Sequence, residues 1–236
     1  FHAGVPGFSG GYIGVDVFYV LSGFFITGLL IRELEANRRI SFSKFYARRF
    51  KRLIPASALV LAATIVAGGF IVAPLTRHSF GWDAVASAWD VSNIRYALQA
   101  TDYLASTEAP SPLLHYWSLA VETQFYLVWP VLILALGLST GGTSPGGKGS
   151  STLAKYAFGV VAAASFAWSL WQTNAAPSEA YFSTFSRAWE FAVGALLASG
   201  HGSRALQRLG QAGRRNAAVA GFALIALAAF GLNEHM

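Results

Sequence analysis

Residues 116–138 read YWSLAVETQFYLVWPVLILALGL, and this stretch decides the class of fold. Its one charged residue is Glu122. Because roughly 20 apolar residues in a helix cross the hydrocarbon core of a bilayer, the stretch predicts a transmembrane helix. Further apolar stretches of similar or slightly shorter length lie at residues 12–31, 55–75, 156–176, 185–200 and 217–232.

These stretches predict an all-α fold, a polytopic transmembrane helical bundle with six full spans. The chain begins with Phe1 and enters apolar sequence within a few residues. We therefore expect residues 1–5 to be the end of an earlier helix, and the chain to be a piece of a longer protein that lacks the start of its first helix.

The composition agrees with a membrane protein. Hydrophobic residues make up 54% of the chain and charged residues 12%, which is about half the charged share of a soluble globular protein. This excludes intrinsic disorder, nucleic-acid binding as a main role and most soluble enzyme classes. The chain has no cysteine, which excludes thiolate nucleophiles, disulfides and Cys-ligated zinc. We expect no metal site.

The positions of the basic residues predict the orientation. Segments 32–54, 139–155 and 201–216 hold eight, two and four of the 17 Lys and Arg residues, and they alternate so as to lie on one side of the membrane. Since an excess of Lys and Arg marks cytoplasmic loops, we expect these three segments to be cytoplasmic. Segment 139–155 is also rich in Gly and Ser, which predicts a flexible loop. The acidic segment 76–115 is expected to be extracytoplasmic.

Ionisable residues inside the apolar stretches are the first candidates for function, since each costs roughly 2.5–3.5 kcal/mol to insert. On a helix, a polar stripe of His115, Ser118 and Glu122 continues into two aromatic residues at steps of three and four, so all share one face. This face is either catalytic or a structural hydrogen-bond stripe between helices. Arg187 and Glu190 stand three apart on another span; they pair with each other, or Arg187 pairs with Glu122.

A basic cluster opens the second span, where residues 44–56 read KFYARRFKRLIPA. Arg48, Arg49 and Arg52 crowd the expected cytoplasmic end of that span. Such a cluster either sets topology and contacts anionic lipids or binds an anionic ligand, because arginine forks hold phosphate bidentately.

Four segments carry a family resemblance. Residues 11–27 read GYIGVDVFYVLSGFFIT, and residues 41–56 read SFSKFYARRFKRLIPA. Residues 112–130 read PLLHYWSLAVETQFYLVWP, and residues 182–194 read FSTFSRAWEFAVG. In this order they resemble the acyltransferase 3 family of integral-membrane O-acyltransferases, the O-antigen and polysaccharide acetylase type. The resemblance covers nearly the whole chain and implies that residues 1–236 are part of one membrane acyltransferase domain that lacks the family's last helices.

The resemblance implies a reaction. An acyl group, commonly acetyl, would pass from cytoplasmic acyl-CoA to a hydroxyl of a cell-envelope carbohydrate or glycolipid. Acetyl-CoA would then be a donor substrate, with no cofactor bound permanently. The protein would be a multi-pass protein of the bacterial plasma membrane, in contact with lipids and with no nucleic-acid partner.

The resemblance also implies roles for residues. His2 matches the family's membrane histidine, and Glu122 the glutamate of its Ser-Leu-x-x-Glu element, so both are expected to be catalytic. Arg49 and Arg52 match its cytoplasmic Arg-x-x-Arg element and, with neighbouring Arg48, are expected to bind the donor. The expected supporting residues are Asp16, His115, Ser118, Arg187 and Glu190.

Two mechanisms and two other functions stay open. His2 either deprotonates the acceptor hydroxyl for direct attack on the thioester or carries the acyl group itself. The main alternative function is a transporter or flippase that binds a lipid-linked glycan through its buried charges. Paired inverted repeats would indicate a transporter, and none is evident in the sequence. The third reading is a non-catalytic membrane partner of another enzyme.

Overall fold

The computed structural model describes residues 9–100, 110–139, 148–201 and 210–231. The predicted His2 and the predicted helix end at residues 1–5 lie outside the described residues. The described part is all-α, as expected, and its elements in chain order are η1 (Ser9–Tyr12), α1 (Ile13–Asn37), α2 (Phe42–Ile71), α3 (Arg77–Ala88), α4 (Ser92–Ala100), α5 (Tyr116–Ser139), α6 (Lys148–Ala175), α7 (Pro177–Phe182), α8 (Thr184–Leu196), η3 (Leu197–His201) and α10 (Gln211–Gly231).

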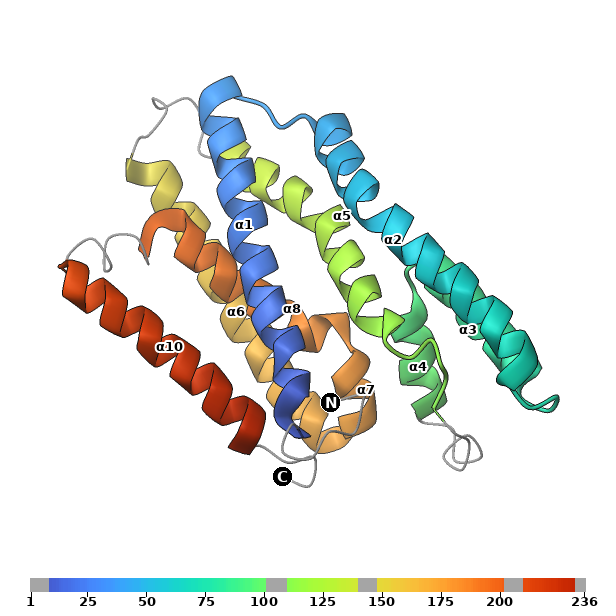
Figure 1. Ribbon diagram of the computed structural model, residues 1–236. Helices are drawn as coiled ribbons and strands as arrows, with labels where there is room; N and C mark the ends of the chain where they lie inside the picture. The colour runs from blue at the N-terminus through green and yellow to red at the C-terminus, as the bar shows by residue number, and fades with distance from the viewer. Residues whose placement is uncertain (1–8, 101–109, 140–147, 202–209, 232–236) are drawn as a thin grey trace.

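The long helices form one elongated bundle (Figure 1). Helix α1 lies at its centre against α8 and α5, and α6 packs behind α8. Helix α2 forms one edge of the bundle with α3 beside it, and α10 forms the other edge. The short helices α4 and α7 pack against each other at the end where α1 begins. Successive long helices alternate in direction.

Three helices in the described part are long and apolar enough to cross a membrane: Ile13–Asn37, Phe42–Ile71 and Tyr116–Ala135. This finding supports three of the six predicted full spans, and the other three stay a prediction. Helix α8 has only 13 residues, which give about 20 Å at 1.5 Å per residue. The first turns of helix α10 contain the charged residues Arg214 and Arg215, which shortens its apolar part. Helix α6 ends in a polar stretch that includes Gln172 and Asn174.

The second span begins earlier than its apolar stretch suggested. Helix α2 starts at Phe42, so Pro55 lies inside the helix rather than in its first turn. Residues 47–52 contain Ala, Arg and Lys, which favour helix, and this continues the helix upstream of the proline. The connection from α1 is short. Arg38 takes a left-handed conformation with φ 57° and donates its backbone N–H to Leu34 O, and Ser41 N donates to Glu33 Oε1 at 2.9 Å.

Segments expected to be loops also contain helix. Lys148 opens α6 inside the segment 139–155, which was expected to be a flexible loop; residues 140–147 lie outside the described part. The expected extracytoplasmic segment 76–115 contains α3 and α4.

Helices α1 and α8 cross with their backbones in contact. A Cβ atom added at Gly23 would clash with the carbonyl oxygen of Phe191 and lie 2.8 Å from its carbonyl carbon. A Cβ added at Gly194 would clash with the carbonyl oxygen of Val20 and lie 2.6 Å from the backbone nitrogen of Phe24. Small residues on both sides thus bring the two backbones into contact, as they do at many membrane helix interfaces.

An aromatic column continues from this crossing through the bundle. Tyr19 of α1 stacks on Phe191 of α8 with ring centroids 4.6 Å apart, and Phe191 stacks on Phe125 of α5 at 3.9 Å. Phe125 contacts Trp129, which in turn stacks on Phe158 of α6. All five rings are buried. The column joins α1, α8, α5 and α6 into one core.

Replacing either crossing glycine with alanine is expected to separate α1 from α8. Overpacking a filled contact costs about 1–3 kcal/mol, and here the obstacle is backbone, which cannot move aside as a side chain can. Gly23→Ala and Gly194→Ala should therefore lower the thermal unfolding midpoint of the purified protein in detergent. Gly14→Ala on the same α1 is the control, since a Cβ there has nothing within 4 Å. Equal midpoints for Gly14→Ala and Gly23→Ala would contradict this account of the crossing.

Candidate functional site

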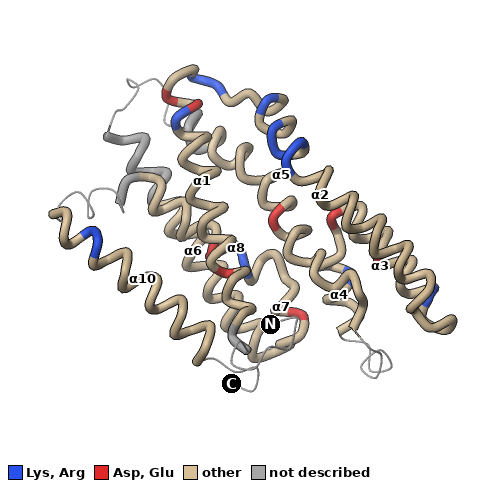
Figure 2. Tube along the Cα trace, in the orientation of Figure 1, with Lys and Arg blue, Asp and Glu red and all other residues tan. Residues whose placement is uncertain are grey.

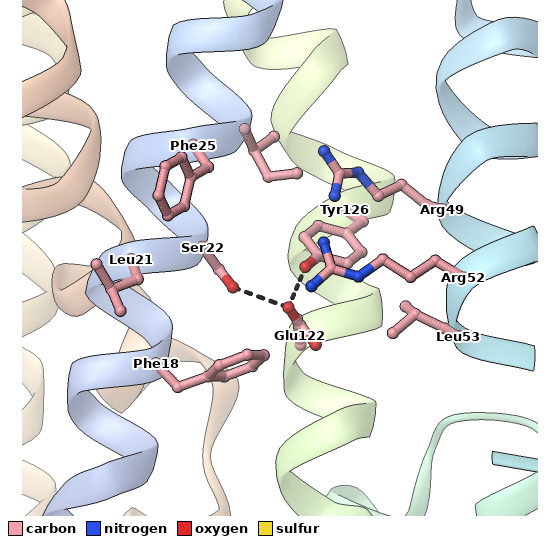
Figure 3. A pocket seen from close by; sticks show the side chains of 10 residues that line it. Phe18, Leu21, Ser22, Phe25, Arg49, Arg52, Leu53, Glu122 and Tyr126 are labelled. Atoms are coloured by element: carbon pink, nitrogen blue, oxygen red, sulfur yellow. Dashed lines mark hydrogen bonds between the residues drawn. The ribbon is translucent and has the colours of Figure 1, made fainter. Parts of the chain in front are cut away.

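A cavity of about 230 Å³ lies between α1, α2 and α5 (Figure 3). Its apolar lining is Phe18, Leu21, Phe25, Ile26 and Leu53. Its polar lining is Ser22, Arg49, Arg52, Glu122 and Tyr126. The structure thus brings three of the predicted site residues, Arg49, Arg52 and Glu122, to one cavity.

Glu122 is the centre of a small hydrogen-bond network. Its side chain is buried, with 2% of the residue exposed. Ser22 Oγ of α1 donates to Glu122 Oε1 at 2.8 Å, and the Tyr126 hydroxyl donates to the same oxygen. Figure 3 shows both donors converging on the carboxylate from different helices. One carboxylate oxygen therefore holds α1 and α5 together at the cavity.

Two arginines reach toward this network from α2 (Figure 3). The Arg49 guanidinium lies over the rings of Tyr126 and Phe45, with 5.5 Å and 5.6 Å to their centroids. Its Nε is buried and has no hydrogen-bond partner among the described residues. Arg52 is exposed and lines the same cavity as Glu122. Two guanidinium groups line the cavity, and the buried Nε of Arg49 has no partner among the described residues, so this wall is suited to an anionic ligand.

Arg48 has a different place from its two neighbours. It does not line the cavity. Its Nη2 lies 3.6 Å from Glu33 Oε2 near the connection between α1 and α2, and half of its side chain is exposed. The expected donor-binding set of three arginines is therefore split, with Arg49 and Arg52 at the cavity and Arg48 in a surface ion pair.

A second charged cluster joins α1 to α8. Arg187 Nη1 lies 2.8 Å from Asp16 Oδ1 and 3.2 Å from Glu190 Oε1. The guanidinium also lies over the rings of Trp117 and Tyr181, at 5.8 Å and 5.3 Å from the centroids. Arg187 thus pairs with Glu190 and Asp16 rather than with Glu122, which decides between the pairings that the sequence left open. None of these residues lines the cavity.

The predicted stripe on α5 is buried over part of its length. Glu122, Phe125 and Trp129 are buried. Ser118 is half-buried, and its Oγ donates to the backbone oxygen of His115 rather than to another helix. His115 is exposed and does not line the cavity. The stripe thus points into the bundle only from Glu122 onward.

Sequence reasoning missed Ser22 and Tyr126. Ser22 was part of an apolar run, and its spacing of six residues from Asp16 places the two on different faces of a helix, so helical periodicity gave no signal for it. Tyr126 follows Glu122 by four residues, a spacing that places the two side chains side by side on a helix. Thr27 was also missed; its Oγ1 accepts a hydrogen bond from Trp129 Nε1 at 2.7 Å. No group of ligating side chains in the described ranges is arranged to hold a metal ion.

Comparison with known proteins assigns this arrangement to a family. The acyltransferase 3 family model, described as "Acyltransferase domain", matches residues 2–236. The chain belongs to this family. Peptidoglycan O-acetyltransferase OatA of Listeria monocytogenes is 34% identical over 199 residues, which are 84% of this chain and 31% of that protein. O-acetyltransferase OatA of Staphylococcus aureus is 42% identical over 136 residues, 58% of this chain and 22% of that protein. No solved structure matches.

The family resemblance expected from the sequence is thereby confirmed, and the chain is an acyltransferase domain with helices long and apolar enough to span a membrane. It spans less than a third of the length of either relative. In its described part, charged side chains from different long helices meet at the cavity, in the Arg187 cluster and in the surface pair of Arg48 and Glu33.

Removing the Arg187 guanidinium is expected to destabilise the protein strongly. Arg187→Ala leaves Asp16 and Glu190 without their cation, and breaking a buried ion pair in this way costs about 3–5 kcal/mol. Arg48→Ala breaks a surface pair with Glu33 and should cost at most about 1 kcal/mol. The stability losses of both variants are measured as changes in the free energy of unfolding in mixed micelles.

A triple variant tests the physical reason. If the cost comes from uncompensated carboxylates, Arg187→Met with Asp16→Asn and Glu190→Gln should recover much of the stability that Arg187→Ala loses. A triple variant less stable than Arg187→Ala would show that the ion pairs themselves stabilise the fold.

Proposed function

We propose that this chain transfers an acetyl group from cytoplasmic acyl-CoA to a hydroxyl of a cell-envelope carbohydrate, with peptidoglycan as the favoured acceptor. The observation that carries the proposal is the cavity in which Arg49 and Arg52 face Ser22 and Glu122 (Figure 3). It combines an anion-binding wall with a carboxylate able to accept a proton. The names of the two OatA relatives support the acetyl group, and that of the Listeria protein supports the acceptor.

The charge distribution supports a cytoplasmic donor. Figure 2 shows Lys and Arg gathered at the end of the bundle where α1 ends and α2 begins. By the positive-inside rule this end faces the cytoplasm. Arg49 and Arg52 lie on α2 between this end and the middle of the bundle, which suits arginines that hold the phosphates of coenzyme A.

The position of the cavity supports transfer at membrane depth. Ser22 is the tenth of the 25 residues of α1, so the polar network lies near the middle of that span. A pantetheine arm that enters from the basic end would bring its thioester toward Glu122. Asp16 and the Arg187 cluster lie about two helical turns before Ser22 on α1, toward the end of the bundle opposite the basic end. The acceptor would approach from that side.

His2 keeps its proposed role as general base or acyl carrier, on the family match alone. The transporter alternative is favoured by the two buried charge clusters. Consumption of the acetyl-CoA thioester by the purified protein separates the two functions, since a flippase leaves the thioester intact.

The donor site is tested by Arg49→Lys with Arg52→Lys. Lysine keeps the charge that sets topology but lacks the planar fork that binds phosphate bidentately. We expect unchanged insertion and a higher apparent Michaelis constant for acetyl-CoA, on the order of tenfold for each 1.4 kcal/mol of binding lost. Arg39→Lys, an exposed residue at the same end, is the control. A Michaelis constant unchanged from wild type would show that these arginines set the membrane topology and do not bind the donor.

The acceptor and His2 are tested together in cells. Envelope glycans from cells with and without the full-length gene are compared by mass spectrometry, and acetylated peptidoglycan is expected only with the gene. His2→Ala should abolish the modification while leaving the amount of protein in the membrane unchanged. Acetylation at wild-type level in the His2→Ala variant would show that His2 is not part of the mechanism. Acetylation of a glycan other than peptidoglycan would show that the proposed acceptor is wrong.

A further inference from the structure

The polar network at the cavity has the geometry of an activated nucleophile. Such a site needs a hydroxyl in hydrogen-bond contact with a base, and a third group that orients the base. Ser22 Oγ donates to Glu122 Oε1 at 2.8 Å, and the Tyr126 hydroxyl fixes the same carboxylate from the next turn of α5. Serine, base and orienting group are thus all present at the cavity wall.

The environment of Ser22 differs from that of a structural serine. A serine within a helix commonly bonds the backbone carbonyl of its own preceding turn, whereas Ser22 donates to a side chain 100 residues away on another helix. It is 8% exposed and lines the cavity. Ser87, by contrast, is 2% exposed and does not line the cavity.

We infer that Ser22 is a catalytic nucleophile that carries the acyl group as an ester between the acyl-CoA donor and the acceptor hydroxyl. The inference rests on the proposed function, because it needs an acyl-CoA thioester at the cavity. It adds a covalent step and a residue that the family match does not supply, and it gives to Ser22 and Glu122 the acyl-carrier and base roles that the family match alone proposes for His2.

The first half-reaction balances within the network. Ser22 Oγ attacks the thioester carbonyl carbon while its proton passes to the Glu122 carboxylate. The carbon–sulfur bond then breaks, and the thiolate of coenzyme A takes that proton from Glu122 and leaves as the thiol. The negative charge on the carbonyl oxygen develops beside Arg49 and Arg52, whose guanidinium groups stabilise it.

The second half-reaction returns the enzyme to its starting state. The acceptor hydroxyl attacks the Ser22 ester, its proton passes to Glu122, and the bond between the acyl carbon and Ser22 Oγ breaks. Glu122 then returns the proton to Ser22 Oγ. Because Ser22 lies in the middle of α1, the ester holds the acyl group at membrane depth after coenzyme A has left toward the basic end.

The test is covalent labelling of the purified full-length protein. The protein is incubated with radiolabelled acetyl-CoA without acceptor and quenched in acid, and the labelled peptide is identified by mass spectrometry. We expect label on Ser22 that alkaline hydroxylamine removes. Ser22→Ala should lose both label and transfer, while Ser87→Ala should label as wild type does. Glu122→Gln should slow labelling about 100-fold or more, as expected for loss of a general base.

Ser22→Cys keeps the test valid if Ser22→Ala fails to fold. A thiol at this position should form a thioester, whose label neutral hydroxylamine removes. The condition that removes the label should therefore change from alkaline to neutral hydroxylamine when Ser22 is replaced by cysteine. Transfer by a folded Ser22→Ala variant at the wild-type rate, or label on a histidine or tyrosine instead, would overturn the inference and leave the proposed function standing. A wild-type protein that consumes no acetyl-CoA would overturn both.

Discussion

The contact between the backbones of α1 and α8 at Gly23 and Gly194 is the constraint on which the rest of the structure depends. Lipid tails are as apolar as the side chains of the helices, so close packing and polar contacts, rather than the hydrophobic effect, hold membrane helices together. A crossing made by backbone allows almost no rotation of α1. It therefore decides which residues of α1 face α8 and which face α5.

The polar contacts of α1 follow from that fixed rotation. Asp16 meets Arg187 of α8, and one turn later the Tyr19 hydroxyl donates to the backbone oxygen of Ser118 on α5 at 3.0 Å. Ser22 meets Glu122 a further turn along, beside Gly23 itself. A small twist of α1 would break all of these contacts together, so the proposed chemistry of Ser22 and the packing of the bundle share one cause.

Helix α2 is attached in a different way, by one tyrosine side chain that reaches from α2 to α5 and another that reaches from α5 to α2. The Tyr46 hydroxyl donates to Leu127 O at 3.0 Å, and the Tyr116 hydroxyl donates to Ser57 O at 2.6 Å. Between these two ties lies the cavity, with Arg49 stacked against Tyr126. The space that such long side chains leave between the helices suits the arm of a donor, and a backbone contact like that of α1 and α8 would close it.

The sequence by itself predicted those features that depend on a single helix or segment. The apolar runs predicted long apolar helices, the positions of Lys and Arg predicted one basic end of the bundle, and the spacing of Arg187 and Glu190 predicted that they share a face. These features were predictable because hydropathy and helical periodicity act within a single segment. The family resemblance was also readable from four short segments.

Only the tertiary structure decided which helices meet. It gave Arg187 a partner 171 residues away at Asp16 and gave Glu122 a partner at Ser22. It also separated Arg48 from Arg49 and Arg52 and began α2 well before its apolar run. Local sequence fixes the face of each helix on which a side chain lies, but the facing helix is set by how closely two backbones approach, and here that distance depends on Gly23 and Gly194 together.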